Sequence, residues 1–328
     1  MHAWSVALVI VLALGFTYTN GFHDAANAVA TSVSTRVLTP RIAVAMAAFA
    51  NFLGAFFGGT VAQTVGSGII AAPAGHTGLV ICAAALAGAT SWNLITWWRG
   101  LPSSSSHALI GGLVGAALAT GSEVYWNGVA AKVLAPMVLL PLAGLASGYV
   151  VMRLLLRAFR TAHPASVLPG FRLAQTVSAS AMAFGHGMQD AAKAAGVIVL
   201  ALSVGGVGVR PAGPVPWWVL AVCALVLSAG TYSGGWRIMR TLGRRLVDLD
   251  SPRGFAAEVS AAVLLYAATA LRAPVSTTHV VASAIIGVGA TRSRKSIRWD
   301  VVRSIVVAWA ITFPAAGAIA AVTAALLT

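Results

Sequence analysis

Two aspartates stand in stretches that are otherwise suited to lipid. Asp24 lies in the segment GFHDAAN, and Asp190 lies in the segment GMQDAAK. A charged side chain at the centre of a bilayer costs roughly 2.5 to 3.5 kcal/mol or more unless it is paired or hydrated. The equivalent placement of the two residues therefore predicts sites for a cation or a proton, rather than two structural carboxylates. Asn27 and Lys193, each three residues further on, share a helical face with their Asp.

Two short runs of hydroxyl side chains form a second repeated feature. Each run follows a proline closely and precedes an apolar run. Ser and Thr at a helix start cap free N–H groups, and the same N-terminus is suited to bind anions. Ordinary capping explains one run, but two runs at one site would surround a small oxyanion with hydroxyls and amides. The residues predicted to bind the substrate are Ser104, Ser105, Ser106, Ser276, Thr277, Thr278, Asn27 and Gln189.

An ion that accompanies the substrate is predicted to use four neighbouring positions, Asp24, Asp190, Lys193 and Glu258. The side-chain oxygens of Asp24 and Asn27 suit sodium or a divalent metal, whereas the Lys193 ammonium can take the electrostatic place of a bound cation. Glu258 has an alternative interpretation, as a partner of Arg253 near the inner surface. The expected co-transported ion is a proton, sodium or a divalent metal, and no other cofactor is expected.

The composition predicts that these residues are held by helices in a membrane. Of 328 residues, 59% are hydrophobic and 9% are charged, whereas soluble domains carry about 25% charged residues. The long apolar runs of this chain can each cross about 30 Å of hydrocarbon as a helix. We therefore predict an all-α polytopic membrane protein. Its ten apolar segments lie near residues 4–33, 41–66, 77–100, 102–121, 130–152, 172–204, 217–237, 254–272, 273–291 and 303–327.

The net charge of +14 is explained by orientation in a membrane rather than by a nucleic-acid partner. The basic residues gather in short loops, near residues 36–41, 153–172, 237–253 and 292–303, while the loops at 66–77, 121–128 and 205–216 are nearly uncharged. Basic loops remain on the cytoplasmic side. We therefore expect a multi-pass protein of the cell (inner) membrane, in contact with the lipid bilayer, with both termini outside.

The chain matches itself in two places. HDAANA at residues 23–28 corresponds to QDAAKA at 189–194, and PSSSSH at 102–107 corresponds to PVSTTH at 274–279, in the same order. Two ordered matches indicate an internal duplication. Five segments in each half make this an inverted-topology repeat, an architecture of many secondary transporters. The predicted parts are a first repeat at 1–155, a cytoplasmic linker at 156–171 and a second repeat at 172–328.

Two pairs of segments, 77–100 with 102–121 and 254–272 with 273–291, are joined by turns too short for a normal loop. Each pair is either two full crossings with a tight turn or a re-entrant helical hairpin. Non-helical backbone at membrane depth is tolerated only where it is buried in protein or lines a cavity. Polar turns are poor lipid-facing elements, so this principle favours a re-entrant hairpin in each half.

Five stretches of the chain resemble the inorganic phosphate transporter (Pit) family. They are GFHDAANAVATSVSTRVLTP, GLPSSSSHALIGGLVGA, HGMQDAAKAAGVIVLAL, GFAAEVSAAVLL and APVSTTHVVASAIIGVGA, which follow the family's order between residues 21 and 290. The resemblance implies an inverted-repeat fold with two re-entrant hairpins. It also implies symport of phosphate with cations, phosphate held between the Asp-bearing helices and the hairpin tips, a homodimer and an elevator-like mechanism.

The resemblance departs from the family's sodium-coupled pattern, Asn-Asp-x-x-Asn, at three positions. His23 stands for the first Asn, and Gln189 and Lys193 stand for both Asn residues of the second copy. Similar bacterial members are regarded as proton-coupled carriers of metal-phosphate complexes, so we expect a proton-coupled symporter. The alternatives are a sodium-coupled phosphate symporter and a sulfate permease of the same fold. A more remote one is an intramembrane aspartyl protease with an Asp dyad, although its Gly-x-Gly-Asp motif is absent.

Overall fold

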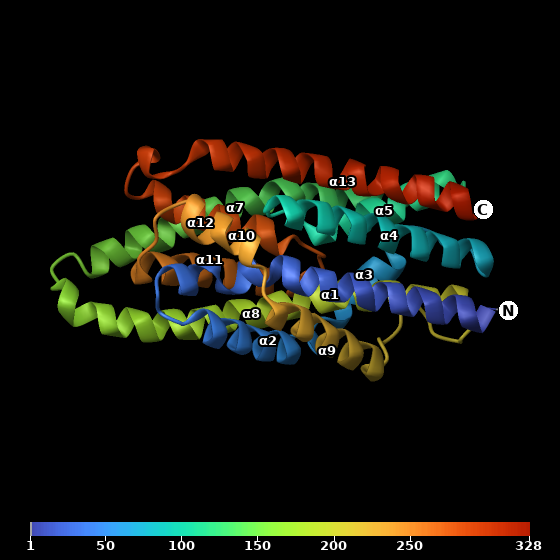
Figure 1. The fold of residues 1–328 in the computed structure, drawn as a ribbon, viewed down its shortest axis with the longest axis horizontal. Helices are drawn as coiled ribbons and strands as arrows, with labels where there is room; N and C mark the ends of the chain where they lie inside the picture. Colours follow the sequence, from blue (N-terminus) through green and yellow to red (C-terminus); the bar gives the residue numbers. More distant parts are fainter. Residues whose placement is uncertain (1) are drawn as a thin grey trace.

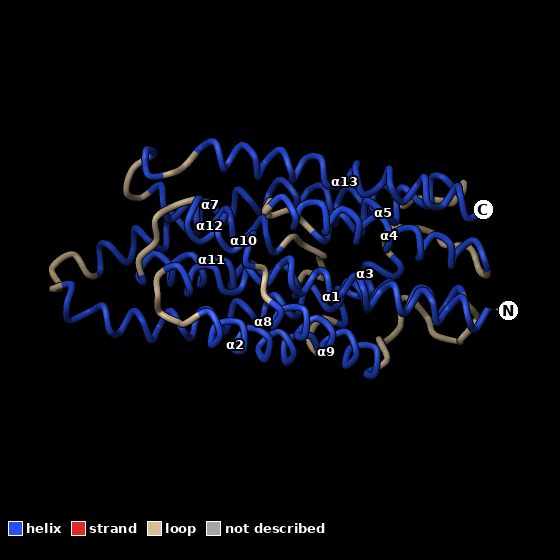
Figure 2. Tube along the Cα trace, viewed as in Figure 1, coloured by secondary structure: helices blue, strands red, loops and turns tan. Residues whose placement is uncertain are grey.

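A computed structural model describes residues 2–328. The chain forms long helices that run roughly along one axis (Figure 1). Within the described residues there are helices and loops and no strand (Figure 2). The α-helices are α1 His2–Ser34, α2 Pro40–Ala55, α3 Gly59–Ser67, α4 His76–Arg99, α5 Ser105–Ala119, α6 Trp126–Val129, α7 Ala135–Ala158, α8 Pro164–Val204, α9 Trp217–Ser233, α10 Trp236–Arg240, α11 Ser251–Ala270, α12 Thr277–Ala290 and α13 Trp299–Leu327.

Three short helices of other types complete these elements. The π-helix η1, Ala130–Leu134, joins α6 to α7, and the π-helix η2, Thr241–Arg245, follows α10. A 3₁₀-helix, Arg294–Ser296, precedes α13. The arrangement confirms the predicted all-α fold.

Among residues 2–328, five helices are long and apolar enough to cross a membrane, namely α1, α4, α6 with α7, α8 and α13. Two further spans are bent, because α2 and α3 meet at 68° and α9 and α10 meet at 57°. Glycines stand at both bends: a Cβ on Gly58 would collide with the carbonyl oxygen of Met188, and one on Gly235 with that of Phe22. Only glycine permits this close helix contact.

Two helical hairpins, α4–α5 and α11–α12, point into the molecule from opposite ends (Figure 1). Their turns lie in the interior, where Ser104 and Ser276 are buried. The return helices contain 15 and 14 residues, fewer than the about 20 that cross a bilayer. The two turns meet, because the Ser106 hydroxyl donates a hydrogen bond of 2.9 Å to the Val275 carbonyl. This is the geometry of re-entrant hairpins.

Helices of one half of the chain pack against helices of the other in a pattern that repeats with the halves exchanged. Helix α1 packs along α9, as α8 packs along α2. In the same way α5 packs on α13, and α12 packs on α7. The predicted duplication leads one to expect these reciprocal pairings. The inverted relation of the halves and their boundaries stay predictions.

Each hairpin is also held by a bent helix of the opposite half. Gly100 after α4 and Arg272 after α11 both have positive φ, 67° and 57°. The Gly100 carbonyl accepts a hydrogen bond of 2.8 Å from the Thr241 hydroxyl. The Arg272 carbonyl accepts one of 2.8 Å from the Thr64 hydroxyl. The bent helices therefore fix the depth of the hairpin turns.

The two ends of the molecule differ in charge. Both termini lie at one end, together with the nearly uncharged loops before α4 and after α8 (Figure 1). The basic connections from α7 to α8 and from α12 to α13 lie at the opposite end. This separation along the long axis agrees with a protein that crosses a membrane in that direction.

Candidate functional site

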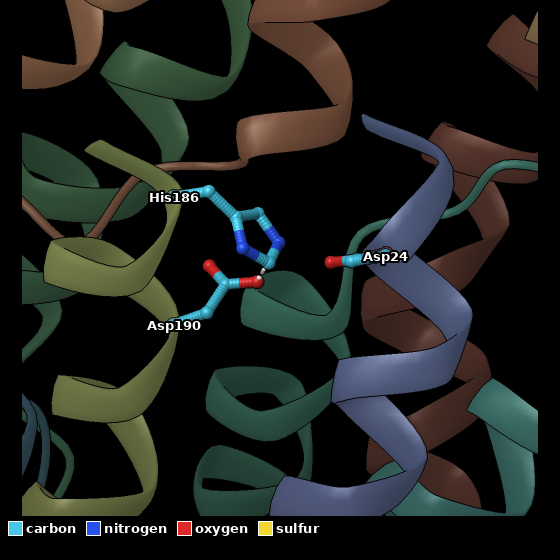
Figure 3. A group of neighbouring side chains, drawn as sticks. All are labelled: Asp24, His186 and Asp190. Atoms are coloured by element: carbon cyan, nitrogen blue, oxygen red, sulfur yellow. Dashed lines mark ion pairs between the residues drawn. The ribbon is translucent and has the colours of Figure 1, made fainter. Parts of the chain in front are cut away.

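The two intramembrane aspartates approach one another at the centre of the molecule. Asp24 on α1 and Asp190 on α8 point toward each other, with His186 of α8 between them (Figure 3). One ligand atom from each of the three residues lies within 4.8 Å of the others, and all three side chains are buried. His186 Nε2 is 3.0 Å from a carboxylate oxygen of Asp190. The structure therefore brings the two predicted aspartates together.

Lys193 neutralises Asp190 directly. Its ammonium lies 2.6 Å from Asp190 Oδ1 and donates a second hydrogen bond of 2.9 Å to the Val275 carbonyl. The Lys193 side chain is 1% exposed, so its charge has no access to bulk water. Removing one partner of a buried pair of this kind strongly destabilises the folded protein, because the other charge is then uncompensated.

Asp24 pairs with no lysine among residues 2–328, and its hydrogen-bond partners are a histidine and hydroxyls of the hairpin turns. Its carboxylate lies 2.7 Å from His23 Nδ1 and accepts a hydrogen bond of 3.2 Å from the Ser105 hydroxyl. The Thr278 hydroxyl donates a longer bond of 3.5 Å. The other nitrogen of His23 lies 3.0 Å from the Thr96 hydroxyl. Both hairpins therefore reach the same carboxylate.

Asn27 joins this group through α12. Its amide nitrogen donates hydrogen bonds of 3.3 Å to the Thr277 hydroxyl and 2.9 Å to the Thr278 hydroxyl. The amide oxygen of Asn27 is buried and has no hydrogen-bond partner among the described residues. Because buried polar atoms are normally satisfied, this oxygen is free to accept a hydrogen bond from a substrate or to bind a cation.

The six hydroxyls of the hairpin turns divide into three groups. Ser104 and Ser276 cap α5 and α12 by accepting the backbone N–H of His107 and His279, at 3.1 and 3.2 Å. Ser106 ties the two turns together. The hydroxyls that contact Asp24 or Asn27 are those of Ser105, Thr277 and Thr278. These three are the members of the predicted set that lie at the aspartates.

The histidines behind the turns meet each other. The rings of His107 and His279 are 4.8 Å apart in an edge-to-face arrangement, and His279 stacks on Trp309 at 3.9 Å. Both histidines are 1% exposed. Their packing orients the starts of α5 and α12 relative to each other.

Gln189 supports the second hairpin. Its amide nitrogen donates to the Thr269 hydroxyl at 2.8 Å and to the Ala273 carbonyl at 3.3 Å. Its amide oxygen accepts the Val275 N–H at 3.1 Å. The side chain is thus engaged by the turn between α11 and α12, and it positions that turn.

Glu258 belongs to a separate polar cluster between α1, α8 and α11. Its carboxylate accepts hydrogen bonds from the hydroxyls of Thr31 and Ser178 and from the Gln175 amide, at 2.5, 2.5 and 3.3 Å. The alternative pairing with Arg253 is wrong, because Arg253 pairs with Asp250, the residue that caps α11. Glu258 is completely buried and has only neutral hydrogen-bond donors as partners.

Sequence reasoning missed two residues of the site, His23 and His186. Each contacts an Asp directly. A signal for His186 was available, because residues i and i+4 face the same side of a helix. The role of His23 depends on Thr96 and Ser103, which come from the first hairpin, and no local pattern indicates this contact.

These groups provide two kinds of ligand at one place. The hydroxyls of Ser105, Thr277 and Thr278 and the first N–H groups of α5 and α12 can donate to a small oxyanion. Carboxylate and amide oxygens and an imidazole nitrogen can bind a divalent cation. The arrangement therefore suits an anion and a cation bound side by side.

Comparison with known proteins places the chain in a defined family. Residues 20–167 and residues 157–320 each match the model of the phosphate transporter family. A solved structure of "The sodium-dependent phosphate transporter" superimposes with a TM-score of 0.91 and 26% identity, covering 98% of both chains.

Several curated relatives carry the name "Probable low-affinity inorganic phosphate transporter". The protein of Rhizobium meliloti is 48% identical over 95% of this chain and 93% of its own length. That of Mycobacterium tuberculosis (strain H37Rv) is 44% identical, over 98% of this chain and 78% of its own. That of Bacillus subtilis is 38% identical, over 96% and 95%.

Proposed function

The chain belongs to the phosphate transporter family, and we propose that it carries inorganic phosphate together with protons across the cell membrane. It is a transporter of phosphate and not an enzyme. The proposal concerns how phosphate binds, which ion drives it and how the protein moves. The observation that carries it is the pairing of Lys193 with Asp190 at 2.6 Å.

Phosphate binds between the hairpin turns and the two aspartates in this proposal. The support is the convergence of Ser105, Thr277 and Thr278 on Asp24 and Asn27. Hydroxyls that now bond to Asp24 can turn to a phosphate oxygen. The starts of α5 and α12 add the positive ends of two helix dipoles.

The charge at the site argues for protons. Suppose that HPO₄²⁻ binds while Asp24 and Asp190 are both ionised. The site then holds four negative charges, two on phosphate and one on each Asp, against one positive charge on Lys193. Buried charges of one sign must be compensated, so protons or a metal ion must enter with the phosphate. Because Lys193 already occupies one oxygen of Asp190, the second half needs no sodium ion.

A divalent metal is the second means of compensation. Asp24, His186 and Asp190 offer two oxygens and one nitrogen that converge on one point, and the free oxygen of Asn27 lies on the same helix as Asp24. Mixed nitrogen and oxygen ligands suit ions such as zinc or manganese. In this proposal the metal is cargo that accompanies the phosphate, bound by Asp24 and Asn27 with the two α8 residues.

Sodium coupling is the competing candidate, and one observation favours it. The solved structure of similar fold bears the name of a sodium-dependent phosphate transporter. In this chain the oxygens of Asp24 and Asn27 would be the sodium ligands. The Asp190–Lys193 pair would then be a structural pair only.

The remaining parts of the proposal concern the whole assembly. We propose that the hairpins and the aspartate helices move as a unit in an elevator-like mechanism, within a homodimer, and that both termini face outward. Support comes from the two hairpins that enter from opposite ends, and from the concentration of basic loops at the end away from the termini (Figure 1).

Uptake by the purified protein in liposomes tests substrate and coupling together. Labelled phosphate should accumulate under an inward pH gradient without sodium, and excess unlabelled phosphate should block it while excess sulfate should not. Asp190→Asn is the inactive control. Uptake driven by a sodium gradient alone would contradict the proposal, and block by sulfate would indicate a sulfate permease.

A further inference from the structure

A cavity lies at the basic end of the molecule, far from the two aspartates. It has a volume of about 560 Å³ and lies between the end of α7, the start of α8 and the start of α11. These elements meet near the α7–α8 connection, which projects beyond the other helices (Figure 1). Its volume falls within the range of small-molecule sites, about 300 to 1,000 Å³.

The wall of this cavity is mainly apolar. Leu156, Phe159, Leu168 and Phe171 are among its lining residues. The Phe159 and Phe171 rings are in edge contact, with centroids 5.1 Å apart. The side chains of Leu156 and Leu168 are 44% and 41% exposed, so the apolar wall is open on one side. An inorganic ion would gain nothing from such a surface, whereas a hydrocarbon chain would.

The mouth of the cavity carries arginine. Arg160 and Arg253 line it, together with one acidic residue, Asp250, which pairs with Arg253. The Nε of Arg253 is buried and has no hydrogen-bond partner within residues 2–328. Arg157, three residues before Arg160, lies in the last turn of α7. The residues that line the cavity therefore carry a net charge of +1. One of them, Arg253, has a donor without an acceptor.

Along the membrane axis, the cavity lies at the level of the lipid headgroups. Helix α8 has 41 residues, or roughly 60 Å at 1.5 Å per residue, about twice the thickness of the hydrocarbon core. Its first turns must therefore extend beyond the hydrocarbon, and the cavity lies at their base. Basic pockets between helices at this level are suited to anionic headgroups.

We propose that this cavity binds one anionic phospholipid from the leaflet at the basic end of the protein. Its phosphate diester accepts hydrogen bonds from the guanidinium groups of Arg160 and Arg253. One acyl chain lies along Leu156, Phe159 and Leu168. A zwitterionic phosphatidylcholine presents its choline cation to the same arginines and binds more weakly.

Native mass spectrometry of the purified protein in detergent measures this binding. The probes are dioleoyl-phosphatidylglycerol and dioleoyl-phosphatidylcholine at matched concentrations. We expect one retained phosphatidylglycerol per chain, with phosphatidylcholine retained about tenfold less, because its choline cation faces a lining of like charge. Addition of inorganic phosphate in excess should not displace the lipid. Displacement by phosphate would overturn the proposal.

Variants separate the cavity from general attraction to a basic surface. Arg160→Gln should weaken phosphatidylglycerol retention about tenfold, whereas Arg292→Gln, the same charge change on an exposed loop, should not. Ala162→Trp fills the cavity, which Ala162 lines, and keeps every charge, so it should also reduce retention. Equal loss in both arginine variants, or full retention in Ala162→Trp, would show diffuse binding and refute the site. Elution at the wild-type volume in size exclusion verifies folding.

Discussion

Lys193 is the residue on which the coupling argument rests. It is buried, and it contacts both Asp190 and the carbonyl of Val275 in the second hairpin. Its ammonium therefore compensates the charge of Asp190 on α8. Through its second hydrogen bond it also positions the turn between α11 and α12. A sodium ion at this place would have to displace this salt bridge, so our proposal assigns no sodium ion to the second half.

Replacement of this residue should change the coupling. Lys193→Asn leaves Asp190 without its countercharge, so proton-driven phosphate uptake in liposomes should fall at least about tenfold, and Lys193→Asn with Gln189→Asn should gain some dependence on sodium. The cost of removing one partner of a buried pair is about 3 to 5 kcal/mol, so folding must be checked. Lys295→Asn, in the exposed 3₁₀-helix Arg294–Ser296, is the matched control. Normal proton-driven uptake by Lys193→Asn would contradict the account.

The hydroxyls at the turns allow a second test on single residues. Ser105→Ala and Thr277→Ala should each weaken phosphate binding by about 1 to 3 kcal/mol, because one hydrogen bond to the anion is lost. Isothermal titration of the purified variants with phosphate measures this change. Ser293→Ala, at the start of an exposed 3₁₀ turn, should bind normally. Unchanged binding in both turn variants would mean that these hydroxyls only support the hairpins.

At the scale of residues, the sequence identified those side chains whose charge would cost free energy in an apolar segment. Asp24 and Asp190 could be found because a charge in an apolar run requires a partner. Gln189 was predicted to bind the substrate, but its amide bonds to Thr269 of α11. His23 was given no role, and its contact with Thr96 comes from the distant helix α4. Polar side chains of this kind are explained by tertiary structure only.

At the scale of elements, close helix packing depends on glycine. The break between α2 and α3 brings Gly58 against α8, only two residues before Asp190 along that helix. A shift of α8 at this place would move the aspartate itself. The ten apolar segments were predictable from hydrophobicity, but the 68° bend between α2 and α3 was not, because a broken span has the same composition as a straight one.

Two neighbouring glycines test this packing. Gly58→Ala introduces a methyl group that collides with the Met188 carbonyl and with Ala192, so we expect a loss of more than about 2 kcal/mol of stability, in the upper range of overpacking effects. Gly59→Ala, one residue later, meets nothing within 4 Å and should be neutral. Thermal unfolding in detergent compares the two. Equal stability of the variants would show that α3 and α8 do not approach so closely.

At the scale of the whole molecule, charge separation predicts the orientation. The basic loops lie at the end away from the termini (Figure 1). Cysteines introduced at Glu123 and Arg210 should therefore react with an impermeant thiol reagent in whole cells, and a cysteine at Arg245 should not. All three positions are exposed, and the two native cysteines are buried. The reverse labelling would overturn the orientation and leave the fold unaffected.

The predicted duplication rests on two short motifs, which also contribute residues to the proposed site. The rest of the two halves shows no such match, so the reciprocal packing of α1 on α9 and α8 on α2 could not be predicted from residue identity. Apolar helices in lipid can pack in many ways with similar energies. The hairpin turns were predictable as polar breaks, and their meeting at Ser106 and Val275 required the structure.

The central claim is that protons enter with phosphate, and proton entry can be observed directly. Purified protein is placed in sodium-free liposomes that contain a pH-sensitive dye, and phosphate is added outside. The account predicts prompt internal acidification beyond that of protein-free liposomes, absent in Asp190→Asn and unchanged by sodium. Labelled phosphate that enters only with sodium, with no internal acidification, would contradict it and leave the Asp190–Lys193 pair a structural role.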